Sequence, residues 1–145
     1  MRKSCVKIIL SLMMGSLTIS GIAFAHGKEK HGKKVPVDAR MKKLHAMMPM
    51  FSIASAELES ALEKGDAAAA KVQADKILAE VLDLKRSKPH KNIKQRKRFV
   101  GLATELEQTV IATVDLAKTG NFSEAKTAFK KVEETCAACH AKFRD

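Results

Sequence analysis

The sequence predicts an all-α protein, an antiparallel up-down-up-down four-helix bundle. Three observations favour this fold class. From residue 38 almost to the end, apolar residues recur at intervals of three and four, the period of an amphipathic helix. Residues that break helices interrupt this pattern between its segments and divide it into four parts. The connections are short, and short connections favour antiparallel neighbours in a bundle.

The first helix is expected to begin after Asp38, a suitable N-cap, and to end at Gly65, a suitable left-handed cap. Pro49 is expected to kink it or to start a second segment, because proline lacks the N–H that a helix interior needs. The expected buried stripe consists of Met41, Leu44, Met48, Phe51 or Ser52, Leu58 and Leu62.

The second helix is expected to start at an Asp66 cap and to end before a loop at residues 85–92, in which His90 is expected to be exposed. The third helix is expected over residues 93–118, with Gly120 as its end. The expected buried residues are Val72, Ile77, Val81 and Leu84 in the second helix, and Phe99, Leu102, Leu106, Thr109 or Val110, Thr113 and Leu116 in the third.

The fourth helix is expected to start at Asn121, with Glu124 three residues on in the position of a capping box. Its apolar residues alternate in steps of three and four, as in a coiled-coil seam. The stripe consists of Phe122, Ala125, Phe129, Val132, Cys136, Cys139 and Phe143. The pattern therefore predicts that both cysteines point into the core, with His140 on the same side.

The N-terminus has the three parts of a secretory signal peptide. Basic residues open the chain, an apolar run follows, and Ala23-Phe24-Ala25 offers a small-residue cleavage site. We expect residues 1–25 to be cleaved, which would export the protein to the periplasm. Residues 26–37 are expected to be a flexible basic leader, and residues 38–145 to form the folded domain.

The formal charge restricts the partners that the chain can have. Cleavage would remove three basic residues and no acidic one, so the formal charge would fall from +11 to +8. A basic surface attracts acidic proteins or anionic membranes. Nucleic acid is not expected as a partner of an exported chain, and the sequence has no tryptophan or tyrosine interleaved with its basic residues.

The run Cys136-Ala137-Ala138-Cys139-His140 carries the strongest functional signal. A C-x-x-C-H sequence is the attachment signature of c-type haem. Two thiols separated by two residues can form thioethers on one porphyrin edge, and the adjacent His140 can bind the iron as the proximal ligand. We therefore expect one covalently bound haem c.

Three other uses of this motif stay open at the level of the sequence. A zinc site normally needs four ligands, and there is no second cysteine pair. A thioredoxin-like redox pair expects a strand–helix–strand context, and a plain disulfide is common in exported chains. A haem-free exported bundle that binds another metal through the same residues is the remaining possibility. Enzymatic activity is not expected, because no nucleophile–base pair or carboxylate pair stands out.

With this motif in its last helix, the chain resembles the class II c-type cytochromes, the cytochrome c′ family. The resemblance covers residues 36–145. It rests on the position of the motif, on Arg40 early in the first helix, and on Phe143 and Arg144, since an aromatic and a basic residue commonly follow the haem histidine there. The resemblance implies a four-helix bundle in which Arg40, Phe143 and Arg144 lie near the haem.

The resemblance also indicates which residues lie at the sixth coordination position of the iron. The distal residue of the family tends to follow the early arginine by four positions, which is Leu44 here. A leucine cannot bind iron, so the distal site would be open and apolar. Low-spin relatives carry a methionine there, and Met41 and Met48 lie one turn on either side of Leu44. His45 is adjacent to it and is the third possible ligand.

Two functions follow from these alternatives. A sixth ligand from Met41 or Met48 favours a periplasmic electron carrier that docks acidic redox proteins through its basic surface. An open site beside Leu44 favours a protein that binds a small gas such as nitric oxide or carbon monoxide. The resemblance further implies a possible homodimer through the first two helices, although Pro49 argues against a copied interface.

Overall fold

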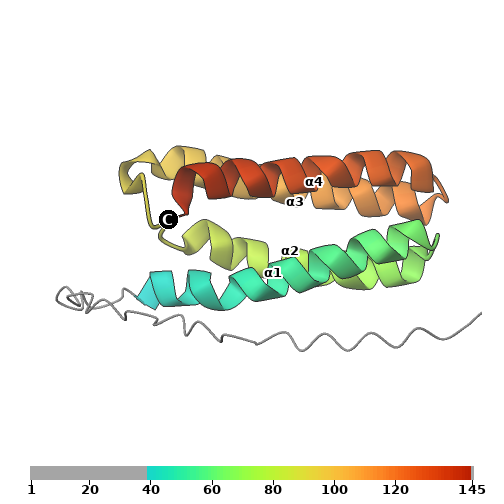
Figure 1. Ribbon diagram of the computed structural model, residues 1–145, viewed down its shortest axis with the longest axis horizontal. Coiled ribbons are helices and arrows are strands. Elements are labelled where there is room, and N and C mark those ends of the chain that lie inside the picture. Colours follow the sequence, from blue (N-terminus) through green and yellow to red (C-terminus); the bar gives the residue numbers. More distant parts are fainter. Residues whose placement is uncertain (1–38, 145) are drawn as a thin grey trace, which may run out of the picture. The chain divides into compact units, whose positions relative to one another are not determined.

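The computed structural model describes residues 39–144, and within them it forms four α-helices joined by short connections. The helices are α1 (Ala39–Glu63), α2 (Ala67–Arg86), α3 (Arg96–Lys118) and α4 (Phe122–Phe143), and the 3-10 turn η1 (Ile93–Gln95) precedes α3. Figure 1 shows that successive helices run in opposite directions, so the predicted all-α up-down-up-down bundle is confirmed. The expected signal peptide, leader and Asp38 cap lie outside the described residues.

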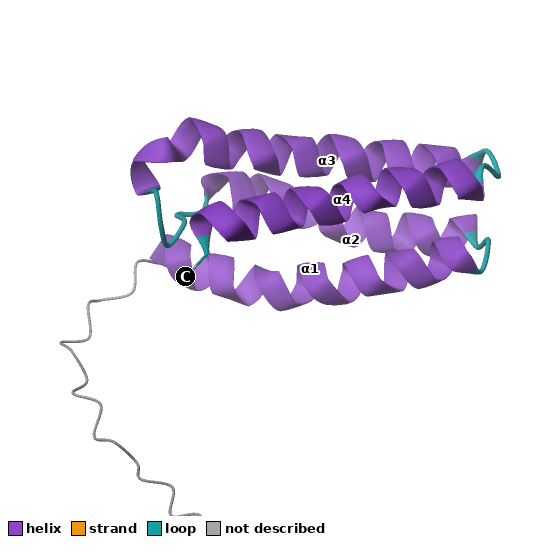
Figure 2. Cartoon of the chain, turned by 45° about the horizontal axis from the view of Figure 1, so that its top comes forward, coloured by secondary structure: helices purple, strands orange, loops and turns teal. Residues whose placement is uncertain are grey.

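The bundle closes into a ring of neighbouring helices. α1 packs against α2, α2 against α3 and α3 against α4, while α1 and α4 approach each other over fewer residues than the other neighbours. Figures 1 and 2 show that the N-terminal turns of α1 lie at the same end as the C-terminal turns of α4. The α2–α3 connection crosses this end, and the two tight turns lie at the other.

Local sequence explains both tight turns. Gly65 and Gly120 have φ angles of +69° and +81°, which glycine adopts without steric cost. The Asp66 side chain accepts a hydrogen bond of 2.8 Å from the Ala69 N–H, as an N-cap should. The expected capping box at Asn121 is wrong: its side chain makes no cap bond and instead donates to Glu124 at 3.3 Å.

Pro49 neither ends α1 nor starts a second segment, since the helix is continuous from Ala39 to Glu63. Proline 49 leaves one backbone carbonyl without its helical donor and is itself exposed, so water can satisfy that group. The core position next to it is Met47, which is 2% exposed, and not the expected Met48, which is half-buried. Ser52 is exposed, and Phe51 takes the buried place.

Small residues occupy more of the core than the hydrophobic pattern predicts. Val72 is 53% exposed, which contradicts its expected burial, and Ala70 and Ala74 face the core in its place. Alanine allows α1 and α2 to approach closely, because its side chain adds little volume between two helices. In α3, Val110 is buried and Thr109 is half-buried; Leu116 is also half-buried, and Ala117 fills the interior at that turn.

Candidate haem site

The C-x-x-C-H residues lie in the last three turns of α4. Cys136 and Cys139 are free thiols, half-buried, and packed against the edge of the core. His140 is half-buried as well, while Ala137 and Ala138 are exposed. Residues three and four positions apart lie on one face of a helix, so the two thiols and the imidazole share one flank of α4.

The cysteines pack against the core on the predicted seam, but neither is fully buried. Thr135 occupies the buried position at that turn, with 5% exposure, and its hydroxyl donates to the Lys131 carbonyl. Both thiols keep part of their surface exposed. The thiols are therefore accessible at the edge of the bundle, where a planar group can reach both of them.

Burial sets the protonation states of the three side chains. It raises the pKa of the Cys136 thiol, with a further contribution from Glu133, and raises the pKa of Cys139 to about 11, with a smaller contribution from Cys136. Burial and the Arg144 charge lower the pKa of His140. The imidazole is therefore neutral near pH 7, which is the form that binds iron.

This donor set fits covalent haem. Among residues 39–144, nothing forms a hydrogen bond with the His140 ring, so its lone pair is available. The two thiols are reduced and lie on the same flank as that ring. Cys136 and Cys139 would hold the porphyrin as thioethers, and His140 would bind the iron from one side. No three His, Cys, Asp or Glu side chains of the described region are grouped to hold a metal ion by themselves.

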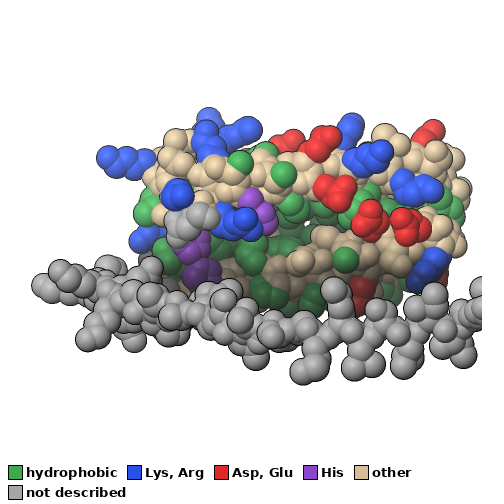
Figure 3. All heavy atoms as spheres, viewed as in Figure 1, with side chains coloured by type: hydrophobic (Ala, Val, Ile, Leu, Met, Phe, Trp, Pro, Cys, Tyr) green, Lys and Arg blue, Asp and Glu red, His purple; other side chains and the backbone are tan. Residues whose placement is uncertain are grey.

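α4 packs against both α3 and α1, and the side of α4 that carries the motif packs against the core. Figure 3 shows a hollow lined with hydrophobic side chains between the upper and lower helices on this face, with histidine side chains beside it. On α1, Lys43 and Glu57 form ion pairs with Asp83 and Lys76 of α2, so the opposite flank of α1 faces α4. Helical spacing places Met41, His45 and Met48 on that opposite flank.

Leu44 and Phe143 are more buried than their neighbours. Leu44 is 7% exposed and belongs to the hydrophobic core, while Met41 and Met48 are half-buried. Phe143 is 3% exposed and meets Phe99 edge to face, with ring centroids 5.3 Å apart. Aromatic pairs prefer this geometry. Arg144 is exposed just beyond the end of α4, where its charge acts on His140.

The α2–α3 connection closes over the end of α4. The backbone N–H groups of His90 and Lys91 donate to the Phe143 carbonyl, and the Asn92 side chain donates to the Lys142 carbonyl at 2.6 Å. These bonds satisfy carbonyls that the end of a helix leaves without partners. They also fix the last turns of α4, and with them the motif.

The sequence did not indicate that His90 makes a contact within the fold. The sequence predicts an exposed loop residue, whereas His90 is half-buried and its Nε2 atom lies 2.7 Å from Nε2 of His45. The two rings are nearly parallel, with centroids 4.7 Å apart. The pair joins α1 to the connection, and no local pattern reveals it, because 45 positions separate the two residues.

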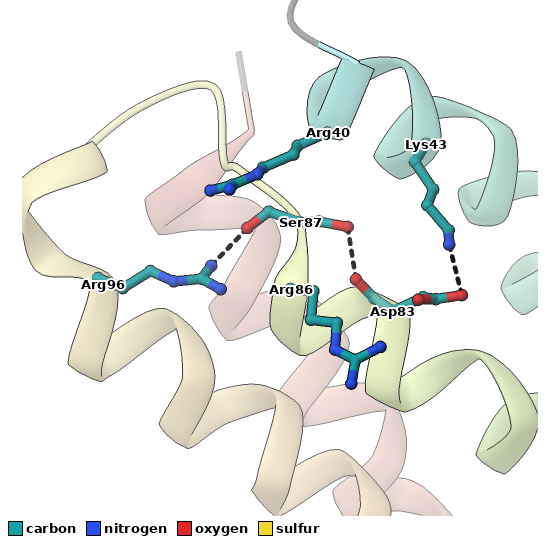
Figure 4. A pocket seen from close by; sticks show the side chains of 6 residues that line it. All are labelled: Arg40, Lys43, Asp83, Arg86, Ser87 and Arg96. Carbon is teal, nitrogen blue, oxygen red and sulfur yellow. Dashed lines mark hydrogen bonds and ion pairs between the residues drawn. The ribbon is translucent and has the colours of Figure 1, made fainter.

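Arg40 lines a pocket of about 450 Å³ at the same end of the bundle. Figure 4 shows the residues that surround it: Arg40, Lys43, Asp83, Arg86, Ser87 and Arg96. Arg96 donates to the Ser87 and Lys85 carbonyls and so caps the C-terminus of α2. Its guanidinium also lies over the Phe99 ring, 5.5 Å from the centroid.

None of the helices within residues 39–144 has the length and apolar character needed to cross a membrane.

The comparisons with known proteins bear on the same region. The family model described as cytochrome C′ matches residues 83–144, from the end of α2 to the end of α4. No match was found among curated proteins or among solved structures.

The matched residues include the complete C-x-x-C-H motif, Phe143 and Arg144. The matched family is one of c-type haem proteins, and the similarity implies a covalently bound haem c. Over residues 83–144 the chain is thus similar to the cytochrome c′ family, the class II c-type cytochromes.

Proposed function

We propose that this protein is a periplasmic electron carrier that holds one haem c between α4 and α1. The observation that carries the proposal is the position of the motif. Cys136, Cys139 and His140 are half-buried in the last turns of α4, and the two cysteines pack against the core. α1 and α4 are the neighbouring helices that approach each other over the fewest residues. A haem there would be enclosed by helices, and enclosure keeps the iron dry and its ligands fixed.

Each residue has a defined part in this proposal. Cys136 and Cys139 anchor the haem, and His140 supplies the proximal ligand in its neutral form. The bound haem would supply one-electron chemistry between ferrous and ferric iron. The chain's own contribution is to hold the axial ligands in place, to exclude water and to limit rearrangement between the two oxidation states.

We place the sixth ligand on α1 at Met48, with Met41 as the alternative. Both are half-buried on the flank that faces α4, and Met48 also packs against the core. A thioether ligand raises the reduction potential, as suits an electron carrier. His45 is less suitable, because its Nε2 atom is already within hydrogen-bonding distance of His90.

Conservative substitutions test this assignment. Met48→Leu keeps the volume and removes the sulfur, so the ferrous low-spin spectrum should be lost and the reduction potential should fall. Met41→Leu is the matched control, one turn from Leu44 on the same flank. If Met41→Leu alone changes the spectrum, Met41 is the ligand; if neither does, a methionine ligand is contradicted.

A second candidate function rests on Leu44. Its buried side chain stands where the family tends to carry its distal residue, and an apolar distal site suits a small gas. If the iron has no protein ligand on that side, the protein would bind carbon monoxide or nitric oxide rather than carry electrons.

The periplasmic location is supported by the signal-peptide pattern of residues 1–25. N-terminal sequencing of protein from the periplasmic fraction should find His26 as the first residue. Recovery of the intact N-terminus in the cytoplasmic fraction would contradict export.

A further inference from the structure

Charge is distributed unevenly along the bundle. We define the basic end as residues 39–45, 83–98 and 139–144, which are the N-terminal turns of α1, the α2–α3 connection with its flanking turns, and the last turns of α4. Within these described segments Asp83 is the single carboxylate. The cationic residues are Arg40, Lys42, Lys43, Lys85, Arg86, Lys88, Lys91, Lys94, Arg96, Lys97, Arg98, Lys142 and Arg144.

Contacts show that these segments form one surface. His45 of α1 meets His90 of the connection, and His90 and Lys91 bind the end of α4 through the Phe143 carbonyl. The pocket in Figure 4 joins α1, α2 and α3 through Arg40, Arg86 and Arg96. In Figure 3, blue side chains gather at this end of the face, and red and blue side chains are mixed over the rest.

Few of these positive charges are neutralised within the described part of the chain. Lys43 pairs with Asp83 at 2.6 Å, and Lys85 pairs with Glu107 at 2.7 Å. Lys91, Lys94 and Lys97 are exposed and form no ion pair with residues 39–144. The basic end therefore carries a net positive field.

The other end of the bundle differs. Two of the lysines there form ion pairs with carboxylates of the same helix, Lys71 with Asp75 and Lys118 with Asp115. Glu57 pairs with Lys76 across α1 and α2. Such pairs cancel each other at a distance, so the molecule presents one strongly charged end and one mixed end.

The basic end is also where the C-x-x-C-H motif lies, because Cys139 and His140 belong to its α4 segment. We propose that the basic end is the docking surface for an acidic redox protein, and that it brings the partner's carboxylates to the end of the bundle that holds the haem. This inference rests on the proposed electron-carrier function and adds the place at which electrons enter and leave.

The chemistry of the surface favours a protein partner. Guanidinium groups pair with carboxylates in bidentate geometry, and the side chains of Arg86 and Arg98 are exposed on this surface. An amphipathic helix that inserts into a membrane surface presents an apolar face beside its cations. Ile93 is the one large apolar side chain that is exposed within the described basic end.

The test uses the holo-protein, reduced, with two small oxidants of opposite charge in stopped flow. The ferrous protein loses one electron, and either hexacyanoferrate(III), an anion, or tris(phenanthroline)cobalt(III), a cation, gains it. The basic-end variant is Lys91→Glu/Lys94→Glu/Lys97→Glu. The matched control is Lys64→Glu/Lys126→Glu/Lys130→Glu, which changes the net charge equally with exposed residues near the other end.

At low ionic strength, the basic-end variant should react with hexacyanoferrate(III) about tenfold more slowly than the wild type, and the control about twofold more slowly. The cationic oxidant should show the opposite order, with the basic-end variant fastest. Polyglutamate serves as a model of an acidic protein. It should slow the reaction of the wild type and of the control with the anionic oxidant, and it should have little effect on the reaction of the basic-end variant.

The results separate a wrong docking surface from a wrong electron-carrier function. If the wild type reacts and both variants slow equally, only net charge matters and the docking surface is contradicted. If the reduced wild type gives up its electron to neither oxidant within seconds, electron transfer itself is contradicted. Binding to phosphatidylglycerol vesicles at physiological salt is a further test. If the wild type and the control bind the vesicles and the basic-end variant does not, the surface belongs to a membrane and the proposal of a protein partner is overturned.

Discussion

Phe143 closes the core at the end of the bundle where the motif lies. It is buried, packs against Phe99, and its carbonyl accepts two backbone hydrogen bonds from the α2–α3 connection. Phe143→Ala should lower the free energy of unfolding by about 3–4 kcal/mol, through lost burial and the cavity left behind. Urea denaturation of the holo-protein measures this change.

Phe122→Ala is the matched control for that substitution. The residue is a phenylalanine of the same helix but is only half-buried, so its loss should be clearly smaller. Equal losses for the two variants would contradict the packing described for Phe143.

The thiols of the motif make the haem-free protein sensitive to alkaline pH. In the folded chain the pKa of Cys139 is raised to about 11, and that of Cys136 is raised as well. Between the ordinary thiol pKa and these values, the folded chain keeps protons that the unfolded chain has lost. Raising the pH therefore favours unfolding, and stability present below about pH 9 is lost as the pH approaches about 11.

Urea denaturation of the reduced haem-free protein from pH 8 to pH 11 checks this expectation. The Cys136→Ala/Cys139→Ala variant should show a smaller loss of stability over the same range. The holo-protein should also show a smaller loss, because a thioether has no proton to release. An identical decline in all three forms would show that other groups cause it.

At the scale of residues, the sequence predicts the site better than its surroundings. Cys136, Cys139 and His140 follow from the motif, because its spacing is dictated by the porphyrin. Their partial exposure does not follow, because the apolar seam predicts Cys136 inside, whereas Thr135 is the buried side chain at that turn and donates its hydroxyl to the Lys131 carbonyl. The contact of His45 with His90 depends on how the connection folds over α4, which no local pattern encodes.

At the scale of elements, the four helices and their two glycine ends are predictable because periodicity and caps act locally. Pro49 is the exception, since α1 continues through it. The contacts of Phe51, Leu58 and other buried residues beyond Pro49 hold the helix together, and tertiary packing overrides the local preference. The burial of alanines in α2 could likewise not be predicted, because alanine is as common on exposed as on buried faces.

Replacing Pro49 should stabilise α1. Pro49→Ala restores the N–H that the helix lacks at this position, and the free energy of unfolding should rise by about 1–3 kcal/mol. Ser52→Ala, at an exposed position nearly one turn further on, is the control and should change it by less than about 0.5 kcal/mol. Thermal unfolding of the holo-protein measures both. No gain in Pro49→Ala would mean that proline costs nothing at this position of α1.

At the scale of the whole molecule, the bundle combines a mixed end with tight turns and a basic end with the motif. The arrangement follows from topology: four antiparallel helices bring the first turns of α1 and the last turns of α4 to the same end (Figure 2). The sequence predicts this topology, but it reveals the concentration of positive charge only once residues 39–45, 83–98 and 139–144 are placed together.

The central claim is that a c-type haem lies between α4 and α1 with protein ligands on both sides of the iron. An optical spectrum of the reduced holo-protein, before and after addition of carbon monoxide, tests it most directly. We expect sharp low-spin ferrous bands that carbon monoxide does not change, because in our proposal a methionine of α1 occupies the sixth position. A broad high-spin spectrum that shifts when the gas is added would contradict it and would favour the gas-binding function beside Leu44.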